Sequence, residues 1–282
     1  MTTRIIDVRG RTVELLEAGS GHPVLYLHDM WDLHTAQAGM FPFHEQLSAN
    51  FRLIAPAHPG CGDSNSIKEI TDIEDLAFHY LDLLNVLGMK AATIVGVGLG
   101  GWIATEMAVR NPERIGRLAL VGAAGLQMPG ALVGDIFMYS QNRDGGIMQE
   151  LRELLFKDAD SDIAHSVVPD GRVNVPDEVR RYKSLTLAGR VGWEPPYLHD
   201  RKLLGRLHRI ACPTLLIWGE HDRFVPLATG EAYAKHIQVA ALHVLAGSGH
   251  SAIIEQPKEC LDLIAPFLAS GILPEGEKRL AD

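Results

Sequence analysis

Continuous apolar runs of strand length recur along the chain. They occupy residues 23–28, 51–56, 92–97, 117–122, 213–219 and 241–247. Apolar runs without polar alternation are typical of parallel strands that are buried on both faces. Near the start, residues 4–8 and 11–17 predict two further strands joined by a turn at Gly10. We expect this pair to form an antiparallel edge of the sheet.

Helical periodicity separates these runs. It is clearest in residues 72–88, where Leu76, Leu83 and Leu87 share one face and Gly88 provides a stop signal. Further helices are predicted at residues 101–110, 229–237 and 256–269. Strands that alternate with helices indicate an α/β fold, here a doubly wound, mostly parallel sheet of the eight-stranded type.

The alternation stops in the middle of the chain. Residues 127–208 contain helical patches but no buried-strand run. We interpret them as a helical cap inserted between the first part of the core, residues 1–126, and its second part, residues 209–282. Caps of this kind shape a substrate pocket above the carboxyl edge of a sheet. A small-molecule ligand is therefore expected.

Composition narrows the class of protein. The 282 residues are 46% hydrophobic and 22% charged, with a net charge of −9. This acidic balance disfavours binding to nucleic acid or to an anionic membrane surface. No apolar stretch approaches a membrane span, and the start shows no signal core. Three cysteines give neither a disulfide framework nor metal spacing. We expect a cytoplasmic protein without a cofactor, and a homodimer is compatible with these features.

The sequence VGVGLGGW, residues 95–102, follows a predicted strand and opens a helix. A nucleophile elbow has the form G-x-S-x-G at such a turn. Gly96 and Gly100 supply the outer glycines, and Gly98 stands where the attacking serine is expected. Glycine suits the strained backbone of this turn but brings no nucleophilic oxygen.

The same letters also fit the dinucleotide-binding pattern G-x-G-x-x-G. That pattern normally opens the first βαβ unit and needs an acidic residue after the next strand. Here it follows four earlier predicted strands, and the next strand, ending in VGAAG, has no such acid. Binding of a nicotinamide cofactor is therefore disfavoured.

Two further positions have the order expected after an elbow. Asp222 follows the run 213–219, and His250 follows the run 241–247. Acid and histidine in this order are typical of hydrolases with a nucleophile elbow. Asp222 would orient His250, and His250 would act as general base. Backbone N–H groups of Leu99 and Met30 would form the oxyanion hole.

Together these motifs resemble the large bacterial α/β-hydrolase family that includes meta-cleavage-product C–C hydrolases and related esterases. The matching segments are LYLHDMW, LIAPAHPGCGDSN, VGVGLGGWIATEMAVRNPERIGRLALVGAAG, YLHDRKLLGRLHRI, CPTLLIWGEHDRFVP and LAGSGHSAIIEQP. The chain departs from the family pattern at four positions. Gly98 replaces serine, Asp29 replaces a glycine, Ala57 replaces an aspartate and Cys61 replaces an aromatic residue.

Three hypotheses follow for the function. The first is a hydrolase-family protein for a small, partly apolar carbonyl compound, with ester or C–C bond hydrolysis as the parent chemistry and with serine-dependent turnover lost at Gly98. The second is a serine-free enzyme that uses His250 and Asp222, since the resemblance implies that cofactor-free dioxygenases and hydroxynitrile lyases share this fold. The third is a non-catalytic small-molecule-binding protein.

Other candidate groups are weaker. Trp102, Trp193 and Tyr197 are candidates to face an apolar ligand, although packing in the core or cap is the preferred interpretation for any one of them. Cys61 has no neighbouring base that would activate a thiol, so loop packing is the preferred interpretation. The spacing of His28, Asp29, Asp32 and His34 could suggest a metal site, but spacing alone is weak support, and no metal is expected.

Overall fold

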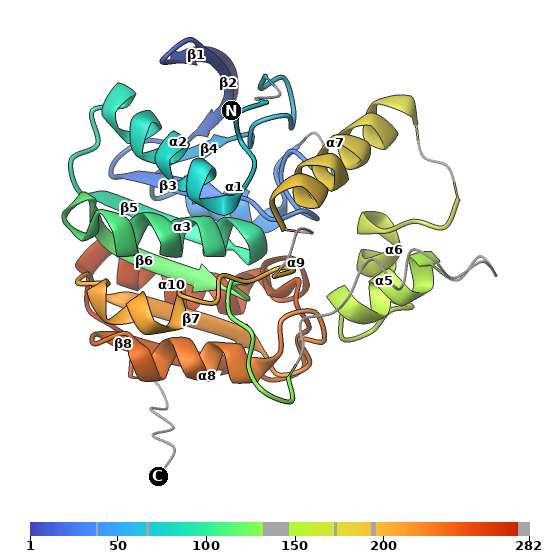
Figure 1. Cartoon of the computed structure of the whole chain (residues 1–282). Helices are drawn as coiled ribbons and strands as arrows, with labels where there is room; N and C mark the ends of the chain where they lie inside the picture. Colours follow the sequence, from blue (N-terminus) through green and yellow to red (C-terminus); the bar gives the residue numbers. More distant parts are fainter. Residues whose placement is uncertain (38, 66–67, 132–146, 172–173, 193–195, 276–282) are drawn as a thin grey trace.

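The computed structural model describes residues 1–37, 39–65, 68–131, 147–171, 174–192 and 196–275. At its centre is an eight-stranded sheet in the order β1-β2-β4-β3-β5-β6-β7-β8 (Figure 1). The pairs β1–β2 and β2–β4 are antiparallel, and the remaining neighbours are parallel. The predicted α/β class, the mostly parallel sheet and the antiparallel edge are confirmed.

Each predicted run overlaps one strand of this sheet. The strands are β1 (Thr2–Val8), β2 (Arg11–Ala18), β3 (Pro23–Leu27), β4 (Arg52–Pro56), β5 (Ala92–Val97), β6 (Ile115–Val121), β7 (Thr214–Gly219) and β8 (Ala240–Leu245). All six residues of β5 and all six of β7 are buried. Central parallel strands are covered on both faces, which explains their unbroken apolar sequences.

Helices cover both faces of the sheet. On one face α2 (Ile73–Val86) packs on α3 (Gly98–Arg110), and the short helix η2 (Leu204–Arg209) contacts both α3 and α8 (Leu227–His236). On the other face α1 (Pro42–Ser48) contacts α9 (Ala252–Glu255) and α10 (Pro257–Ser270). In Figure 1, α3 and α8 lie in front of the sheet and α10 behind it. The arrangement is doubly wound, as predicted.

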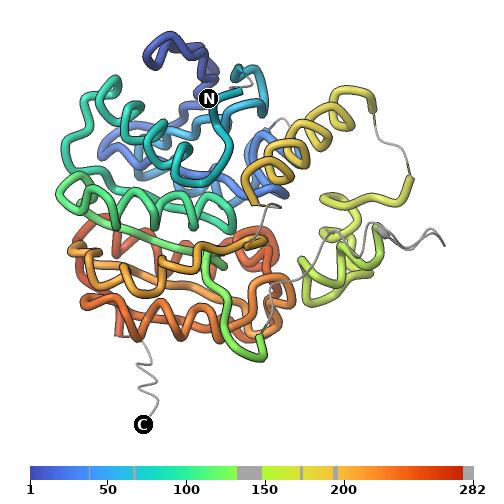
Figure 2. Tube along the Cα trace, viewed as in Figure 1, coloured from blue at the N-terminus to red at the C-terminus, as the bar shows by residue number. Residues whose placement is uncertain are grey.

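Among the described residues, three α-helices precede η2 between β6 and β7: α5 (Ile147–Leu155), α6 (Asp162–Val167) and α7 (Val175–Gly192). The tube in Figure 2 leaves the core after β6, passes through these helices to one side of the sheet and returns before β7. No strand of the sheet falls in the described part of residues 127–208. The boundaries of the cap stay a prediction.

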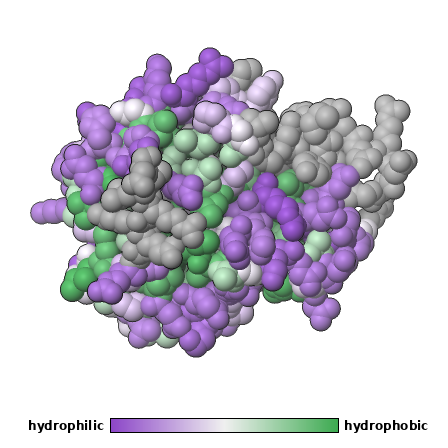
Figure 3. Space-filling model, turned by 90° about the horizontal axis from the view of Figure 1, so that it is seen from below, coloured by the Kyte–Doolittle hydropathy of each residue, from purple (hydrophilic) through white to green (hydrophobic). Residues whose placement is uncertain are grey.

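The surface seen in Figure 3 is mostly polar where the structure describes it, with apolar residues showing between the polar ones. Among the described helices, none combines the length and the apolar character needed to cross a lipid bilayer.

Candidate active site

Four strand ends bring the candidate site together. Strands β3, β5, β7 and β8 run parallel, so the segments after them meet at one edge of the sheet. Asp29 follows β3 and Gly98 follows β5 directly. Asp222 lies three residues beyond β7, and His250 lies in the loop after β8. Residues far apart in the sequence therefore lie within contact distance of one another.

Asp222 and His250 form a buried hydrogen-bonded pair. His250 Nδ1 donates to Asp222 Oδ2 over 2.8 Å. The other carboxylate oxygen, Oδ1, accepts hydrogen bonds from the backbone N–H groups of Phe224 at 3.0 Å and Val225 at 2.7 Å. The Phe224 ring meets the imidazole edge-on at 4.9 Å between centroids. The structure thus brings together the acid and histidine that the sequence pairs, and it fixes the rotamers of both.

The electrostatics of this pair favour a charged imidazole. Burial alone would lower the pKa of His250, but Asp222 and then Asp29 outweigh it and raise the pKa to about 10. The ring is therefore an imidazolium at neutral pH. A general base must be neutral before it accepts a proton, so the role of His250 as general base stays a prediction.

Gly98 occupies the elbow turn in a left-handed conformation, with φ of +51°. A non-glycine residue there is strained by about 1–3 kcal/mol. The turn is also crowded at Gly100, where a Cβ would lie within 2.7 Å of the His28 carbonyl oxygen and closer still to that of Leu27. The backbone of an elbow is therefore present at residues 96–100, and the side chain at its centre is absent.

The Asp29 carboxylate fills the space in front of Gly98. A Cβ on Gly98 would lie 2.7 Å from Asp29 Oδ2 and closer still to Cγ and Oδ1. Asp29 Oδ1 accepts a hydrogen bond from the Leu99 N–H at 2.9 Å. Asp29 Oδ2 lies 3.4 Å from His250 Nε2, an ion-pair contact. That nitrogen forms no hydrogen bond within the described structure.

Sequence reasoning missed this role of Asp29. It treated the residue as a departure in the loop after β3, separate from the departure at Gly98, and as one member of a weakly supported metal spacing. The signal that could have found it is the combination. Gly98 is smaller than the residue expected there, and Asp29 is larger. Such a pair is expected when two positions are in contact and the side chain of one fills the volume left by the other.

The two predicted oxyanion donors differ in their present partners. The Leu99 N–H donates to Asp29, whereas the Met30 N–H donates no hydrogen bond to any described residue. The Met30 carbonyl accepts a hydrogen bond from the Ser184 hydroxyl on α7 at 3.1 Å. The inserted segment is therefore tied to the loop that carries Asp29 and Met30.

Buried polar side chains hold this loop in place. Asp32 Oδ1 accepts from the Asp29 N–H at 3.2 Å, and the Tyr26 hydroxyl donates to Asp32. His28 Nδ1 lies 2.7 Å from the Asp29 carbonyl oxygen, and His28 Nε2 accepts from the His58 N–H at 3.0 Å. Burial lowers the pKa of His28 well below its usual value. His28 is therefore neutral, with its proton on Nδ1.

The structure describes two of the three aromatic candidates for ligand contact. Trp102 on α3 is buried, and its Nε1 donates to Glu106 Oε1 at 3.2 Å. Tyr197 is 62% exposed, which does not support a place against an enclosed apolar ligand. Trp193 lies outside the described residues. Contact of these residues with a ligand stays a prediction.

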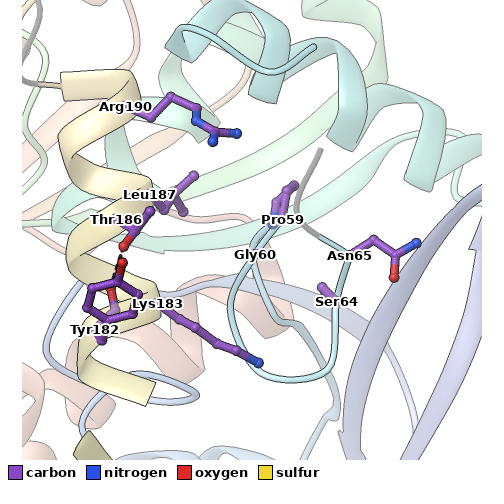
Figure 4. A pocket seen from close by; sticks show the side chains of 9 residues that line it. All are labelled: Pro59, Gly60, Ser64, Asn65, Tyr182, Lys183, Thr186, Leu187 and Arg190. Carbon is purple, nitrogen blue, oxygen red and sulfur yellow. Dashed lines mark hydrogen bonds between the residues drawn. The ribbon is translucent and has the colours of Figure 1, made fainter. Parts of the chain in front are cut away.

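A separate hollow of about 390 Å³ lies between α7 and the loop of residues 59–65. Figure 4 shows Lys183 reaching from α7 towards this loop, and its Nζ donates to the Gly62 carbonyl at 2.5 Å. Arg190 lies on the same helix beside the hollow. Neither Asp29, Gly98 nor His250 lines it. This hollow is therefore not the site of the Asp222–His250 pair.

Comparison with known proteins places the geometry in a family. A model described as the alpha/beta hydrolase fold matches residues 34–257. The chain is 28% identical to 2-hydroxymuconate semialdehyde hydrolase of a Pseudomonas species, over 94% of this chain and 93% of that protein. It is 30% identical to a 2-hydroxy-6-oxononadienedioate/2-hydroxy-6-oxononatrienedioate hydrolase of Burkholderia vietnamiensis, over 89% of each.

A similar solved structure is that of the meta-cleavage product hydrolase CumD from Pseudomonas fluorescens, with a TM-score of 0.76 and 24% identity over 96% of this chain and 98% of that one. This likeness concerns the fold. The eight-stranded sheet, the elbow turn after β5 and the family match over most of the length agree with one another. The chain therefore belongs to the α/β-hydrolase fold family.

Proposed function

We propose that the chain is a hydrolase-family enzyme that acts, without a serine nucleophile, on a small, partly apolar carbonyl compound. The observation that carries this proposal is the buried His250–Asp222 pair, whose other ring nitrogen, Nε2, lies 3.4 Å from Asp29 Oδ2. A histidine held between an acid and the elbow is a proton-transfer unit in the place where this fold does its chemistry.

The proposed reaction does not use a serine nucleophile, because Gly98 has no hydroxyl group. Proton transfer remains. The imidazolium of His250 can protonate a carbonyl oxygen or a leaving group, and the conjugate base that results can activate a water molecule. General acid–base catalysis alone contributes typically ~10²–10⁴-fold. An activated substrate is therefore required.

The names of the relatives suggest such a substrate. They include hydrolases of 2-hydroxymuconate semialdehyde and of 2-hydroxy-6-oxo-6-phenylhexa-2,4-dienoate. Compounds of this type place a ketone or aldehyde in conjugation with an enol. Protonation of such a system weakens the bond beside the carbonyl. We propose a conjugated oxo-dienoate as the substrate class, with C–C bond hydrolysis as the reaction and ester hydrolysis as its alternative.

The test is turnover of 2-hydroxy-6-oxo-6-phenylhexa-2,4-dienoate, followed by the loss of its visible absorbance and by identification of benzoate. We expect His250→Gln to lower kcat by on the order of 10²-fold or more. The matched control is His208→Gln, an exposed histidine on η2 that lies outside the site. Binding of the dienoate without turnover by the unaltered protein would contradict the proposal and favour a binding protein.

A further inference from the structure

We propose that Asp29 is a carboxylate nucleophile that replaces the missing serine and attacks a saturated carbon bearing a leaving group, as in an alkyl halide, to form an Asp29 alkyl ester. This activity goes beyond the proposed function. It uses the same histidine but a different class of substrate, so the two proposals fail independently.

The first argument is position. A side chain at residue 98 and the Asp29 carboxylate cannot coexist, because the Cβ of the former would overlap Cγ and both oxygens of the latter. The carboxylate therefore occupies the volume that a serine side chain would use. Carboxylates are established covalent nucleophiles in other enzymes. An oxygen atom at the elbow is thus supplied from the loop after β3 rather than from the elbow itself.

The second argument concerns the oxyanion donor. The Leu99 N–H points at Asp29 Oδ1, so it does not serve the carbonyl oxygen of a bound substrate. A donor stabilises charge that develops on the atom it already addresses. In the hydrolysis of an Asp29 ester, negative charge develops on Oδ1 as water attacks Cγ. The Leu99 N–H is therefore placed to stabilise the hydrolysis of an ester formed on Asp29, and the group that the substrate contributes to this ester would be an alkyl group.

The third argument is that the carboxylate is held in place. The backbone of Asp29 is fixed by Asp32 at its N–H and by His28 at its carbonyl. The Leu99 N–H fixes Oδ1, which leaves Oδ2 beside His250 Nε2. A nucleophile fixed at both ends has little orientational freedom to lose in the transition state.

The reaction balances in two steps. Asp29 Oδ2 attacks the carbon, the carbon–halogen bond breaks, and halide leaves with the electron pair. Esterification removes the charge of Asp29, so the pKa of His250 falls and the ring releases its proton to solvent. The neutral ring then takes a proton from water as that water attacks Cγ. Collapse breaks the bond between Cγ and Oδ2, and His250 returns the proton to the departing alcohol. The Asp29 carboxylic acid that remains passes its proton to His250, which restores the starting carboxylate and imidazolium. The sum is halide plus water to alcohol plus hydrogen halide.

The probe is 4-nitrobenzyl bromide, whose leaving group needs no proton. Alkylation of thiols is suppressed because burial raises the pKa of Cys61 to about 12 and that of Cys212 to about 11. His250→Gln should block the second step and accumulate close to one equivalent of ester on Asp29, located by peptide mass spectrometry. Asp29→Asn combined with His250→Gln should carry no adduct there, and His208→Gln should turn over without accumulating one.

A second measurement uses the unaltered protein. In ¹⁸O-water, a first turnover through the ester yields unlabelled alcohol and places the label in the Asp29 carboxylate. Direct attack of water on the probe would label the first alcohol instead, and this result would overturn the proposal. Absence of an Asp29 adduct in His250→Gln protein that retains its thermal unfolding transition would overturn it as well. Dienoate turnover reports on the other proposal and does not affect this outcome.

Discussion

Placing a serine at residue 98 alone should damage the protein rather than activate it. In Gly98→Ser the new Cβ would lie within 2.7 Å of Asp29 Oδ2 and closer still to Cγ and Oδ1. The backbone around it cannot yield, because Gly100 is already in close approach to the end of β3. The carboxylate must therefore move away from the Leu99 N–H and from His250.

The cost follows from two effects. A serine at φ of +51° adds about 1–3 kcal/mol of strain. A buried carboxylate that loses its partner adds about 3–5 kcal/mol. Together they are comparable with the whole stability of a typical domain, about 5–15 kcal/mol. Asp29→Gly alone should cost less, about 1–3 kcal/mol, because the Leu99 N–H loses its acceptor.

The two changes should then be strongly non-additive. In the Gly98→Ser background, Asp29→Gly removes the overlap and the displaced charge, so it should recover roughly 3–5 kcal/mol, whereas in the unaltered protein it destabilises. Urea unfolding of the four proteins measures this double-mutant cycle. The double variant should also gain hydrolysis of a p-nitrophenyl ester, on the order of 10²-fold or more, below the ~10⁶ of a complete triad. Equal stability of Gly98→Ser and the unaltered protein, with a gain of esterase activity in the single variant, would refute this reasoning.

Three other predictions concern the charge of His250 and the burial of the cysteines. The pKa of His250 rises on folding from 6.5 to about 10, so the stabilising contribution of its charge is complete below pH 6.5 and is lost as pH rises through 10. The urea concentration at the midpoint of unfolding, measured against pH, should show this loss of stability. In Asp29→Asn the loss should occur at lower pH. Asp222→Asn should lower the pKa of His250 further than Asp29→Asn does, because Asp222 is the stronger of the two partners, and proton NMR of the imidazole reports both. Thiol titration with a disulfide reagent at pH 8 should label none of the cysteines in the native protein and all of them in denaturant, because each is buried: Cys61, Cys212 and Cys260.

The sheet and the Asp222–His250 pair could be predicted from the sequence because both follow from regular patterns. Parallel strands need continuous apolar runs, and the order of strand ends fixes which loops meet at one edge. The Asp222–His250 contact is a consequence of that order. The exposure of Tyr197 could not be predicted, since it lies in a segment without periodicity, where the direction of a side chain depends on tertiary contacts.

The charge state of His250 was also beyond the sequence. Asp222 raises the pKa of His250 most, and a second carboxylate, Asp29, on the other side of the ring raises it further. That second group comes from the loop after β3, whose path is set by buried hydrogen bonds to Asp32 and His28 rather than by any pattern in the chain. Interpreting Asp29 therefore required its position in space.

Gly98 and Asp29, the two departures that the sequence resemblance implies at the elbow, have one physical explanation. Gly98 without Asp29 would leave an empty volume at the elbow, and both the Leu99 N–H and His250 Nε2 would lose the carboxylate that they now contact. Asp29 without Gly98 would overlap the side chain of residue 98. Each change is unfavourable alone, and together they restore a filled, charged and hydrogen-bonded elbow. A chain that had only lost its serine would need Gly98 and nothing else. Because the acid is fixed against the oxyanion donor and the histidine, the site is better explained as a rebuilt one than as a damaged one.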